Sequence, residues 1–188
     1  MKKVILLACM MFFGTAKATV ISLDVNDTNP TVGDTVSVSI SLTDVTDDFA
    51  SLFTGIQFDA SAFQYVEGSV NSDFPGFDDV TFSGLDVDTV LAGDGSLFFN
   101  LFEDIFMPVS YSMGDFLVAS FDLLAVSAGT STLALLDTTL FAAGSFDEIV
   151  PTDGVTTVSA NVVGVSAPSV FALLSIAGIA LFGFRRKA

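Results

Sequence analysis

Between residues 19 and 163 the chain contains no histidine, lysine, arginine, cysteine or tryptophan. Serine–histidine, cysteine–histidine and lysine nucleophiles are therefore excluded from this region, and a zinc site would lack its usual ligands. A nucleic-acid partner is excluded too, because no cationic side chain could neutralise its phosphates. The only cysteine, Cys9, lies near the N-terminus, so the rest of the chain has neither disulfide nor thiolate chemistry.

Charge of the two signs is segregated along the chain. All six basic residues lie in the terminal segments: Lys2, Lys3, Lys17, Arg185, Arg186 and Lys187. All 22 acidic residues lie between Asp24 and Asp153, which gives this region a net charge of −22, against −16 for the whole chain. Such self-repulsion destabilises the compact state at low ionic strength, and salt should screen it. The pattern indicates divalent cations, a salty medium or a cationic partner; the alternative is that acidity only provides solubility.

Carboxylates are the remaining candidates for catalysis, as the acid and base of glycoside hydrolysis. Glu and Asp adjoin only at Glu103-Asp104 and Asp147-Glu148. Neighbouring residues of a strand point to opposite faces, so neither pair would converge on a substrate. We therefore interpret both as solvated acidic turns and predict that the chain is not an enzyme.

Calcium is the one metal that this inventory permits, since it is bound by carboxylate and carbonyl oxygens. The segment from Asp24 begins like an EF-hand loop, but Asn29 stands where the loop needs glycine and Thr35 where it needs glutamate. Asp86 and Asp88 are two residues apart, so on a strand their side chains would share one face. The calcium candidates are Asp24, Asn26, Asp27, Asp86 and Asp88. The alternative is that these are isolated surface carboxylates, and no other cofactor is expected.

The N-terminus has the layout of a secretory signal peptide. Met1-Lys2-Lys3 is a basic start, residues 4–14 are apolar, and Ala16-Lys17-Ala18 forms an A-x-A cleavage site. We predict a signal peptide over residues 1–18 and a mature chain that begins at Thr19. The rival reading, a lipoprotein box that ends at Cys9, leaves too short an apolar core before the cysteine.

Residues 19–163 are predicted to form a single all-β domain. Val36, Val38, Ile40 and Leu42 alternate with polar residues, which is typical of a strand with one wet face. Residues 117, 119, 121 and 123 follow the same alternation and should face the core. Phe116 and Val118 should then lie on the outward face of that strand. Nine strands are predicted, at residues 20–25, 36–42, 53–58, 63–66, 79–83, 97–102, 117–123, 131–136 and 156–162.

Glycine, proline and aspartate turns separate these runs, so the pattern predicts an antiparallel β-sandwich. Fifteen of the 20 phenylalanines lie in this region. Because phenylalanine is large and has no polar group, we expect these side chains to form the core rather than a recognition surface.

Three segments resemble a cohesin domain. They are Val32-Gly33-Asp34-Thr35-Val36 with Asp44-Val45-Thr46-Asp47, then Gly55-Ile56-Gln57-Phe58-Asp59 with Ser61, Phe63 and Tyr65, and last Gly114 to Phe121 with Ala128-Gly129-Thr130-Ser131-Thr132-Leu133. The resemblance spans most of residues 31–136; the acidic insert at 71–94 has no place in it. It implies a nine-stranded jelly-roll sandwich that binds partner proteins or cell-surface assemblies and is not itself an enzyme. A dockerin partner is not implied.

Residues 164–188 are predicted to be a membrane segment. An uncharged run at 170–184 precedes Arg185-Arg186-Lys187. As a helix this run spans a little over about 20 Å, and the uncharged lead from Val162 brings it close to the roughly 30 Å hydrocarbon core. The basic end should stay cytoplasmic, so everything upstream is expected outside that membrane. A buried core helix is the alternative, which the terminal cations and the lack of amphipathic period disfavour.

The tail also resembles the PEP-CTERM sorting signals of Gram-negative bacteria, which combine small residues and proline, a short apolar helix and a terminal Arg-Arg. Ser166-Ala167-Pro168 stands where the family has Pro-Glu-Pro. The resemblance implies processing by an exosortase-type enzyme, transient anchoring in the inner membrane and delivery to the cell surface or extracellular matrix. A permanent membrane anchor is the alternative. The predicted processing residues are Ala16, Ala18, Ser166, Ala167, Pro168, Arg185 and Arg186.

Two functions are consistent with these features. The first is a non-enzymatic exported protein that mediates adhesion or association with exopolysaccharide, a surface protein or a biofilm. The second is a carbohydrate-binding module that uses phenylalanine and carboxylates, with or without calcium. A carboxylate-based hydrolase is a distant third.

Overall fold

The computed structural model describes residues 18–103, 109–145 and 147–165. Most of the predicted signal peptide, including Ala16, lies outside these residues, as does the predicted sorting tail from Ser166 to Arg186. Within the described ranges no helix is long and apolar enough to cross a membrane. The interpretation of both terminal segments therefore remains a prediction.

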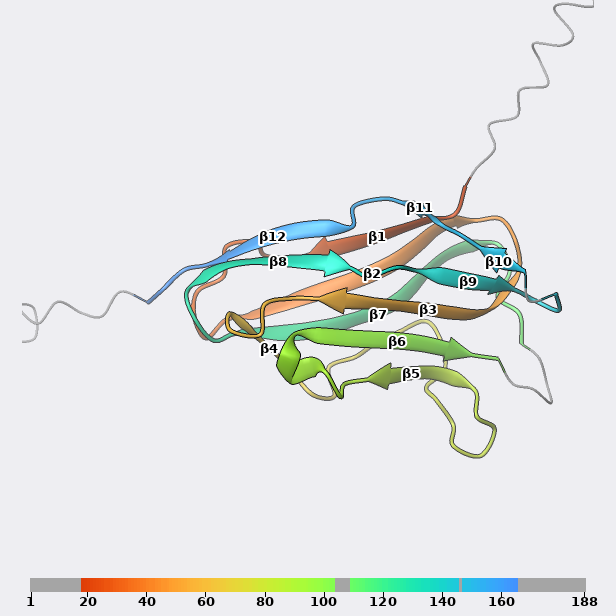
Figure 1. Cartoon of the computed structure of the whole chain (residues 1–188), viewed down its shortest axis with the longest axis horizontal. Helices are drawn as coiled ribbons and strands as arrows, with labels where there is room; N and C mark the ends of the chain where they lie inside the picture. Colours follow the sequence, from red (N-terminus) through yellow and green to blue (C-terminus); the bar gives the residue numbers. More distant parts are fainter. Residues whose placement is uncertain (1–17, 104–108, 146, 166–188) are drawn as a thin grey trace, which may run out of the picture.

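Two β-sheets pack face to face (Figure 1). The described residues form β1 (Val20–Val25), β2 (Thr35–Val45), β3 (Phe49–Gln57), β4 (Phe63–Tyr65), β5 (Gly84–Asp88), the short 3-10 helix η1 (Ala92–Asp94), β6 (Ser96–Phe102), β7 (Gly114–Ala125), β8 (Gly129–Leu135), β9 (Thr139–Ala142), β10 (Glu148–Ile149), β11 (Thr152–Asp153) and β12 (Thr157–Val162).

The first sheet has the order β11-β1-β2-β7-β4. Its central strand, β2, pairs antiparallel with β1 and β7. Val36, Val38, Ile40 and Leu42 are fully buried, while the residues between them are exposed or half-buried. The alternation predicted for this strand is thus confirmed, and its apolar face covers the second sheet.

The second sheet has β3 in the middle and β6 and then β5 on one side. On the other side β3 pairs in succession with β8 and β9, which together act as one interrupted strand. Beyond them, β12 pairs with β8 and β10 pairs with β9. Between β10 and β12 the chain crosses to the first sheet, where β11 lies parallel to β1. We call β10 and β12 together the outer row of the second sheet. The crossing leaves a break in this row between the two strands.

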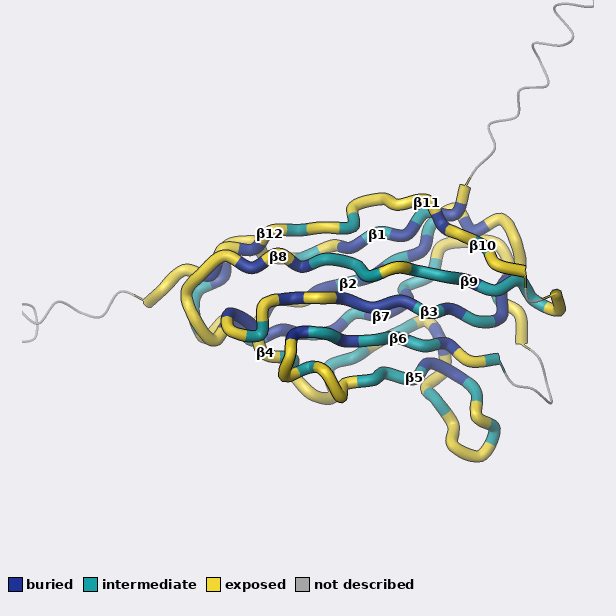
Figure 2. Tube along the Cα trace, viewed as in Figure 1, coloured by how far each residue is buried: buried dark blue, intermediate teal, exposed yellow. Residues whose placement is uncertain are grey.

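The core lies between the sheets (Figure 2). Phe99 of β6 and Phe121 of β7 meet across it, with ring centroids 5.4 Å apart. At one end, Phe49, Phe74, Tyr111 and Phe116 form an aromatic cluster with centroid distances of 4.8–6.3 Å. Phe74 belongs to the insert that the sequence did not place, so burial of this ring fixes part of the insert on the sandwich.

The strand predicted at residues 79–83 is wrong. These residues form a turn, which the Asp78 carboxylate closes by accepting a 2.7 Å hydrogen bond from the Val80 amide. Phe82 has a φ of 53°, a left-handed conformation that no regular strand contains. The strand, β5, begins after the turn, because the local hydrogen bonds of aspartate outweigh the β-propensity of valine, threonine and phenylalanine.

The inward face predicted for residues 117–123 is also partly wrong. A register shift lies opposite Ile40 and Ser41 of β2, where Val118 is an extra residue between paired Ala119 and Leu117. Because a bulge of this kind adds one residue to the strand, the residues before it that were expected to face outward face the core instead. Phe116, expected on the outside, therefore packs against the core.

The predicted antiparallel sandwich is confirmed, with more strands than the nine expected. The sequence did not indicate β9, β10 and β11, which are only two to four residues long. Strands this short carry too few residues for a period-two pattern to emerge.

Candidate functional site

The outer face of the second sheet carries a group of phenylalanines among polar side chains. On β6, Leu97, Phe99 and Leu101 are buried, so Phe98 and Phe102 point away from the core. Register extends this outer face across the sheet, because directly paired residues share a side: Phe53 of β3 pairs with Asn100 and Thr139, and Phe141 of β9 pairs with Glu148. We define the aromatic face as Phe53, Phe98, Phe102, Leu136 and Phe141. None of these side chains packs against the core cluster.

Phe53 holds the aromatic face together. Its ring meets those of Phe102 and Phe141 edge to face, with centroids 5.7 and 5.9 Å apart and planes at 82° and 83°. Phe77, from the insert, meets Phe102 in the same way at 5.9 Å. Edge-to-face pairs of this kind are favourable and fix ring orientation. The aromatic face is therefore a preorganised surface rather than a set of independent side chains.

Gly55 explains how the middle of this face closes. It lies on β3 directly opposite Phe98. A Cβ atom at this position would stand 2.9 Å from the Leu97 carbonyl oxygen and 3.0 Å from the Cδ1 atoms of Phe98 and Leu136. Only the missing side chain lets these two apolar groups approach each other above the strand.

The outer face of the first sheet is polar by contrast. Across β1, β2 and β7 the paired outward residues are Ser22 with Ser41, Asp24 with Ser39, Ser39 with Ser120, and Ser37 with Asp122. Ser37 donates a 2.7 Å hydrogen bond to the Asp122 carboxylate. Serine is what a sheet face turned to water is expected to carry. The aromatic face is therefore specific to one side of the molecule.

Carboxylates border the aromatic face. Asp86 pairs with Asn100 and Asp88 with Phe98 on the β5 side, and Glu148 pairs with Phe141 on the β10 side. None of the residues that the structure describes is lysine or arginine. An apolar centre with a charged rim is the general composition of a protein–protein interface.

The first group of calcium candidates is occupied with local hydrogen bonds. The Asn26 side-chain oxygen accepts from the Ser37 amide at 2.9 Å, and the Asp27 carboxylate accepts from the Asn29 amide at 2.8 Å. Asp24 is exposed on β1. The side-chain oxygens of Asn26 and Asp27 therefore stabilise the β1–β2 connection.

The second group, Asp86 and Asp88, shares the outer face of β5 as the spacing predicts. Within the described part of the chain no three acidic, histidine or cysteine side chains are grouped to hold a metal ion. Calcium binding therefore gains no support from the arrangement of these carboxylates and remains untested.

The adjacent carboxylates considered for catalysis lie at the sandwich margin. Glu103 directly follows β6, while its neighbour Asp104 is outside the described residues. Asp147 and Glu148 are both exposed at the start of β10. The exposure of Asp147 and Glu148 is that of solvated carboxylates, not of the desolvated carboxyl that a general acid needs.

Sequence reasoning missed the aromatic face because phenylalanine was assigned to the core as a class. Phe49, Phe63, Phe99 and Phe121 do lie there. The overlooked signal is in residues 97–102, where Phe98 and Phe102 alternate with the buried residues Leu97, Phe99 and Leu101 and so lie on the other face of the strand. In an antiparallel sandwich, large apolar residues on the second face of a strand indicate an outward apolar surface.

The fold and this surface together define a class: a two-sheet sandwich whose distinctive feature is one outward apolar face, as in a protein-interaction module. The family model described as "Cohesin domain" matches residues 21–159. The chain belongs to the cohesin domain family. No curated protein sequence matches it.

Solved structures share the fold at low sequence identity. The sixth cohesin from scaffoldin B of Acetivibrio cellulolyticus, in complex with a Cel5 dockerin, is 15% identical, with a TM-score of 0.57 over 78% of this chain and 99% of that one. The solution structure of CaCohA2 from Clostridium acetobutylicum is 22% identical, with a TM-score of 0.54 over 79% and 94%. The cohesin module of a family 33 glycoside hydrolase from Clostridium perfringens is 14% identical, with a TM-score of 0.56 over 80% and 100%.

Cohesin domains are non-catalytic scaffolding modules, which agrees with the prediction that this chain is not an enzyme. The cohesin resemblance noted in the sequence is thereby confirmed. The resemblance of the tail to a sorting signal remains a prediction, because residues 166–188 lie outside the described residues.

Proposed function

We propose that the chain is an exported adhesion or scaffold protein that docks a partner protein on its aromatic face. The observation that carries this proposal is the contrast between the two outward sheet faces, one lined with phenylalanine and the other with serine. Exposing phenylalanine to water costs free energy, roughly 25 cal/mol per Å² of apolar surface, and a bound partner would recover it.

The partner should be unlike this chain in charge. Two copies would bring together two bodies that each carry 22 carboxylates and no cations between residues 19 and 163, so self-association through this face is opposed. An apolar patch with a basic rim complements the aromatic face. Matching structures include cohesins in complex with dockerins, and a dockerin-type module is the partner class that this family membership favours.

A pair of arginine substitutions tests the proposal. Asn100 lies within the aromatic face, whereas Ser39 lies on the polar outer face of the other sheet. In quantitative binding assays with proteins captured from the native host's exterior, we expect Asn100→Arg to weaken binding at least tenfold and Ser39→Arg to leave it unchanged. Both variants change the net charge equally, so equal weakening by the two would refute docking on this face.

A carbohydrate partner is the second candidate. Aromatic rings beside the polar groups of Asp86 and Asn100 on one sheet face are a surface that could also hold a sugar. Retention of the protein on the host's extracellular polysaccharide, with and without calcium, separates the two functions. No retention in either condition removes this candidate, together with a role for calcium in it.

Delivery to the cell exterior is proposed from the two terminal segments. The basic and apolar start with its Ala16-Lys17-Ala18 site supports export, and the tail supports recognition by an exosortase-type enzyme in the inner membrane of a Gram-negative bacterium. Attachment to exopolysaccharide or a biofilm would follow processing. One solved structure with this fold is a type II cohesin domain from the cellulosome of Acetivibrio cellulolyticus. Membership of the cohesin family is therefore compatible with an exterior location for this chain.

Intact mass and C-terminal peptide mapping of the protein from each cell fraction tests this route. A C-terminus between Ser166 and Ser169 in an outer or released fraction is the expected result. A C-terminus at Ala188 in the inner membrane would instead establish a permanent anchor.

A further inference from the structure

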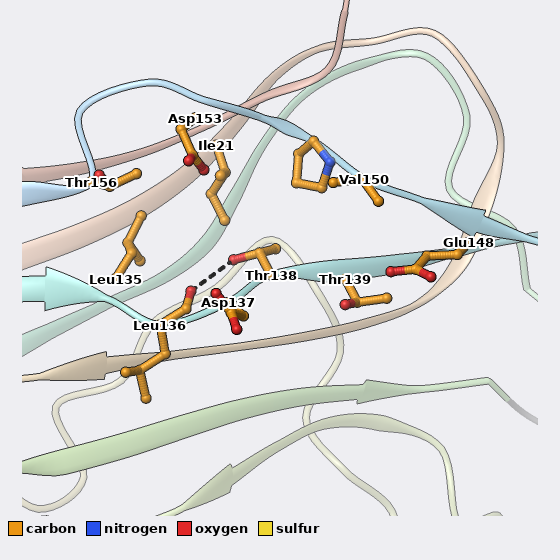
Figure 3. A pocket seen from close by; sticks show the side chains of 11 residues that line it. Ile21, Leu135, Leu136, Asp137, Thr138, Thr139, Glu148, Val150, Asp153 and Thr156 are labelled. Atoms are coloured by element: carbon orange, nitrogen blue, oxygen red, sulfur yellow. Dashed lines mark hydrogen bonds between the residues drawn. The ribbon is translucent and has the colours of Figure 1, made fainter.

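A cavity of about 420 Å³ opens at the break in the outer row of the second sheet. It lies where β8 has ended at Leu135 and β9 has not yet begun at Thr139, and where the chain leaves β10 to cross to the first sheet. Figure 3 shows this arrangement, with lining residues from both sheets. The cavity is a consequence of the topology, because no strand fills the gap between β10 and β12.

The floor of the cavity is apolar and rigid. Ile21, which is 1% exposed, and Pro151, which is buried, both line it. Backbone hydrogen bonds fix the crossing segment above β1: Gly154 donates to the Ile21 carbonyl at 2.8 Å and Thr152 donates to the Thr19 carbonyl at 2.7 Å. A preformed apolar floor suits the methylene stem of a long side chain.

The rim of the cavity is negative. Asp137 in the β8–β9 connection, Glu148 on β10 and Asp153 on β11 border the hollow from three sides (Figure 3). All three are exposed, and no hydrogen bond joins their carboxylates to other residues in the described ranges. By contrast, Asp59 and Asp78 accept backbone amides within their own turns. The rim carboxylates are thus available to an external cation.

The cavity continues the aromatic face. Leu136 belongs to both, Thr139 lines the cavity and pairs with Phe53, and Glu148 pairs with Phe141. Thr138, in the cavity wall, is held by a 2.7 Å hydroxyl contact with buried Thr54 of β3. A partner that covered the aromatic face would therefore pass over the mouth of the cavity.

We infer that this cavity binds a lysine or arginine side chain of the docked protein partner, with the aliphatic stem on Ile21 and Pro151 and the cationic head among Asp137, Glu148 and Asp153. The identity of the partner rests on the proposed docking function. The cavity supplies the charge selection that the apolar face lacks, because a partner without a basic residue at this place would leave three carboxylates partly desolvated and unpaired.

A titration that needs no partner tests the inference. The full-length, ¹⁵N-labelled chain in a neutral detergent is titrated with N-acetyl-lysine methylamide and, separately, with the norleucine analogue that lacks the ammonium group. We expect saturable shifts of the Thr138, Thr139 and Thr156 amides with the lysine compound only. The variant Asp137→Asn/Glu148→Gln/Asp153→Asn should weaken its binding at least tenfold.

The matched control is Glu67→Gln/Asp79→Asn/Asp94→Asn, which removes the same charge from residues that do not line this cavity; it should bind like wild type. Equal shifts with norleucine, equal weakening by the two triple variants, or no shifts at all would overturn the inference. Failure here with a preserved difference between Asn100→Arg and Ser39→Arg would refute the cavity alone, whereas loss of that difference would refute docking on the face.

Discussion

At the scale of single residues, position in the strand decides what each phenylalanine does. Phe98 and Phe99 are neighbours in sequence, yet Phe99 is fully buried and Phe98 lies on the outer face. The same side chain therefore belongs to the core at one position and to the outward aromatic face at the next. Substitutions of phenylalanine should separate into these two groups by their effect on folding.

Phe121→Ala should destabilise the fold strongly. The ring is 1% exposed and packs against Phe99 at 5.4 Å, so its loss leaves a cavity and should cost about 3–5 kcal/mol. Urea unfolding measures this loss. Phe82→Ala, at a side chain that is 66% exposed, is the control and should stay within about 0.5 kcal/mol of wild type; equal effects would contradict the assigned core.

Asp59 should contribute a pH-dependent part of stability. Its carboxylate accepts hydrogen bonds from the Ser61 hydroxyl at 2.7 Å and the Ser61 amide at 2.8 Å, which lower the pKa of this carboxyl below its usual 3.8. A lowered folded-state pKa means that the contribution is present above pH 3.8 and is lost as pH falls through the folded-state pKa.

We therefore expect the difference in unfolding free energy between wild type and Asp59→Asn to be constant near neutrality and to change below pH 3.8. Unfolding curves between pH 7 and pH 2.5 measure it. A difference that does not vary with pH would show that the charged form of Asp59 has no special role.

At the scale of elements, the sequence indicates long strands well and their interruptions poorly. The alternation in β2 predicts its buried face because each inward residue packs on the opposite sheet. In β7 the bulge at Val118 reverses the parity, and no local residue pattern marks it, because its cause is the pairing with β2. The aromatic face was missed for a related reason: only the register across β3, β6 and β9 brings its side chains together.

Gly55→Ala should disturb the central strand of that face. The added methyl group would meet the Leu97 carbonyl oxygen and the side chains of Phe98 and Leu136 at 2.9–3.0 Å. Overpacking of this kind costs typically about 1–3 kcal/mol, and chemical denaturation would measure it. Gly76→Ala adds the same group where no atom lies within 4 Å; a similar loss in both variants would argue against close packing above Gly55.

At the scale of the whole molecule, charge composition predicted the electrostatic character and strand alternation predicted the fold class, but neither predicted the aromatic face. The segregation of charge is visible in the sequence alone. The β8–β9 interruption and the crossing of β11 depend on long-range pairing, so the cavity at their junction has no sequence signature.

Salt should stabilise the folded chain. The region between Asp24 and Asp153 has no cation to offset its 22 carboxylates, so screening lowers the free energy of the folded state more than that of the expanded state. We expect a higher Tm in about 0.5 M sodium chloride than at low ionic strength. An equal concentration of a neutral osmolyte is the control, and an unchanged Tm in salt would contradict the electrostatic picture.

Docking on the aromatic face is tested most directly by photo-crosslinking in the native host. A photoreactive phenylalanine analogue replaces Asn100, which lies beside Phe53 and Asp86, or Ser39 on the opposite sheet. The predicted result is a discrete covalent adduct with another protein from position 100 and none from position 39. Adducts from both positions alike, or only from position 39, would contradict docking on this face.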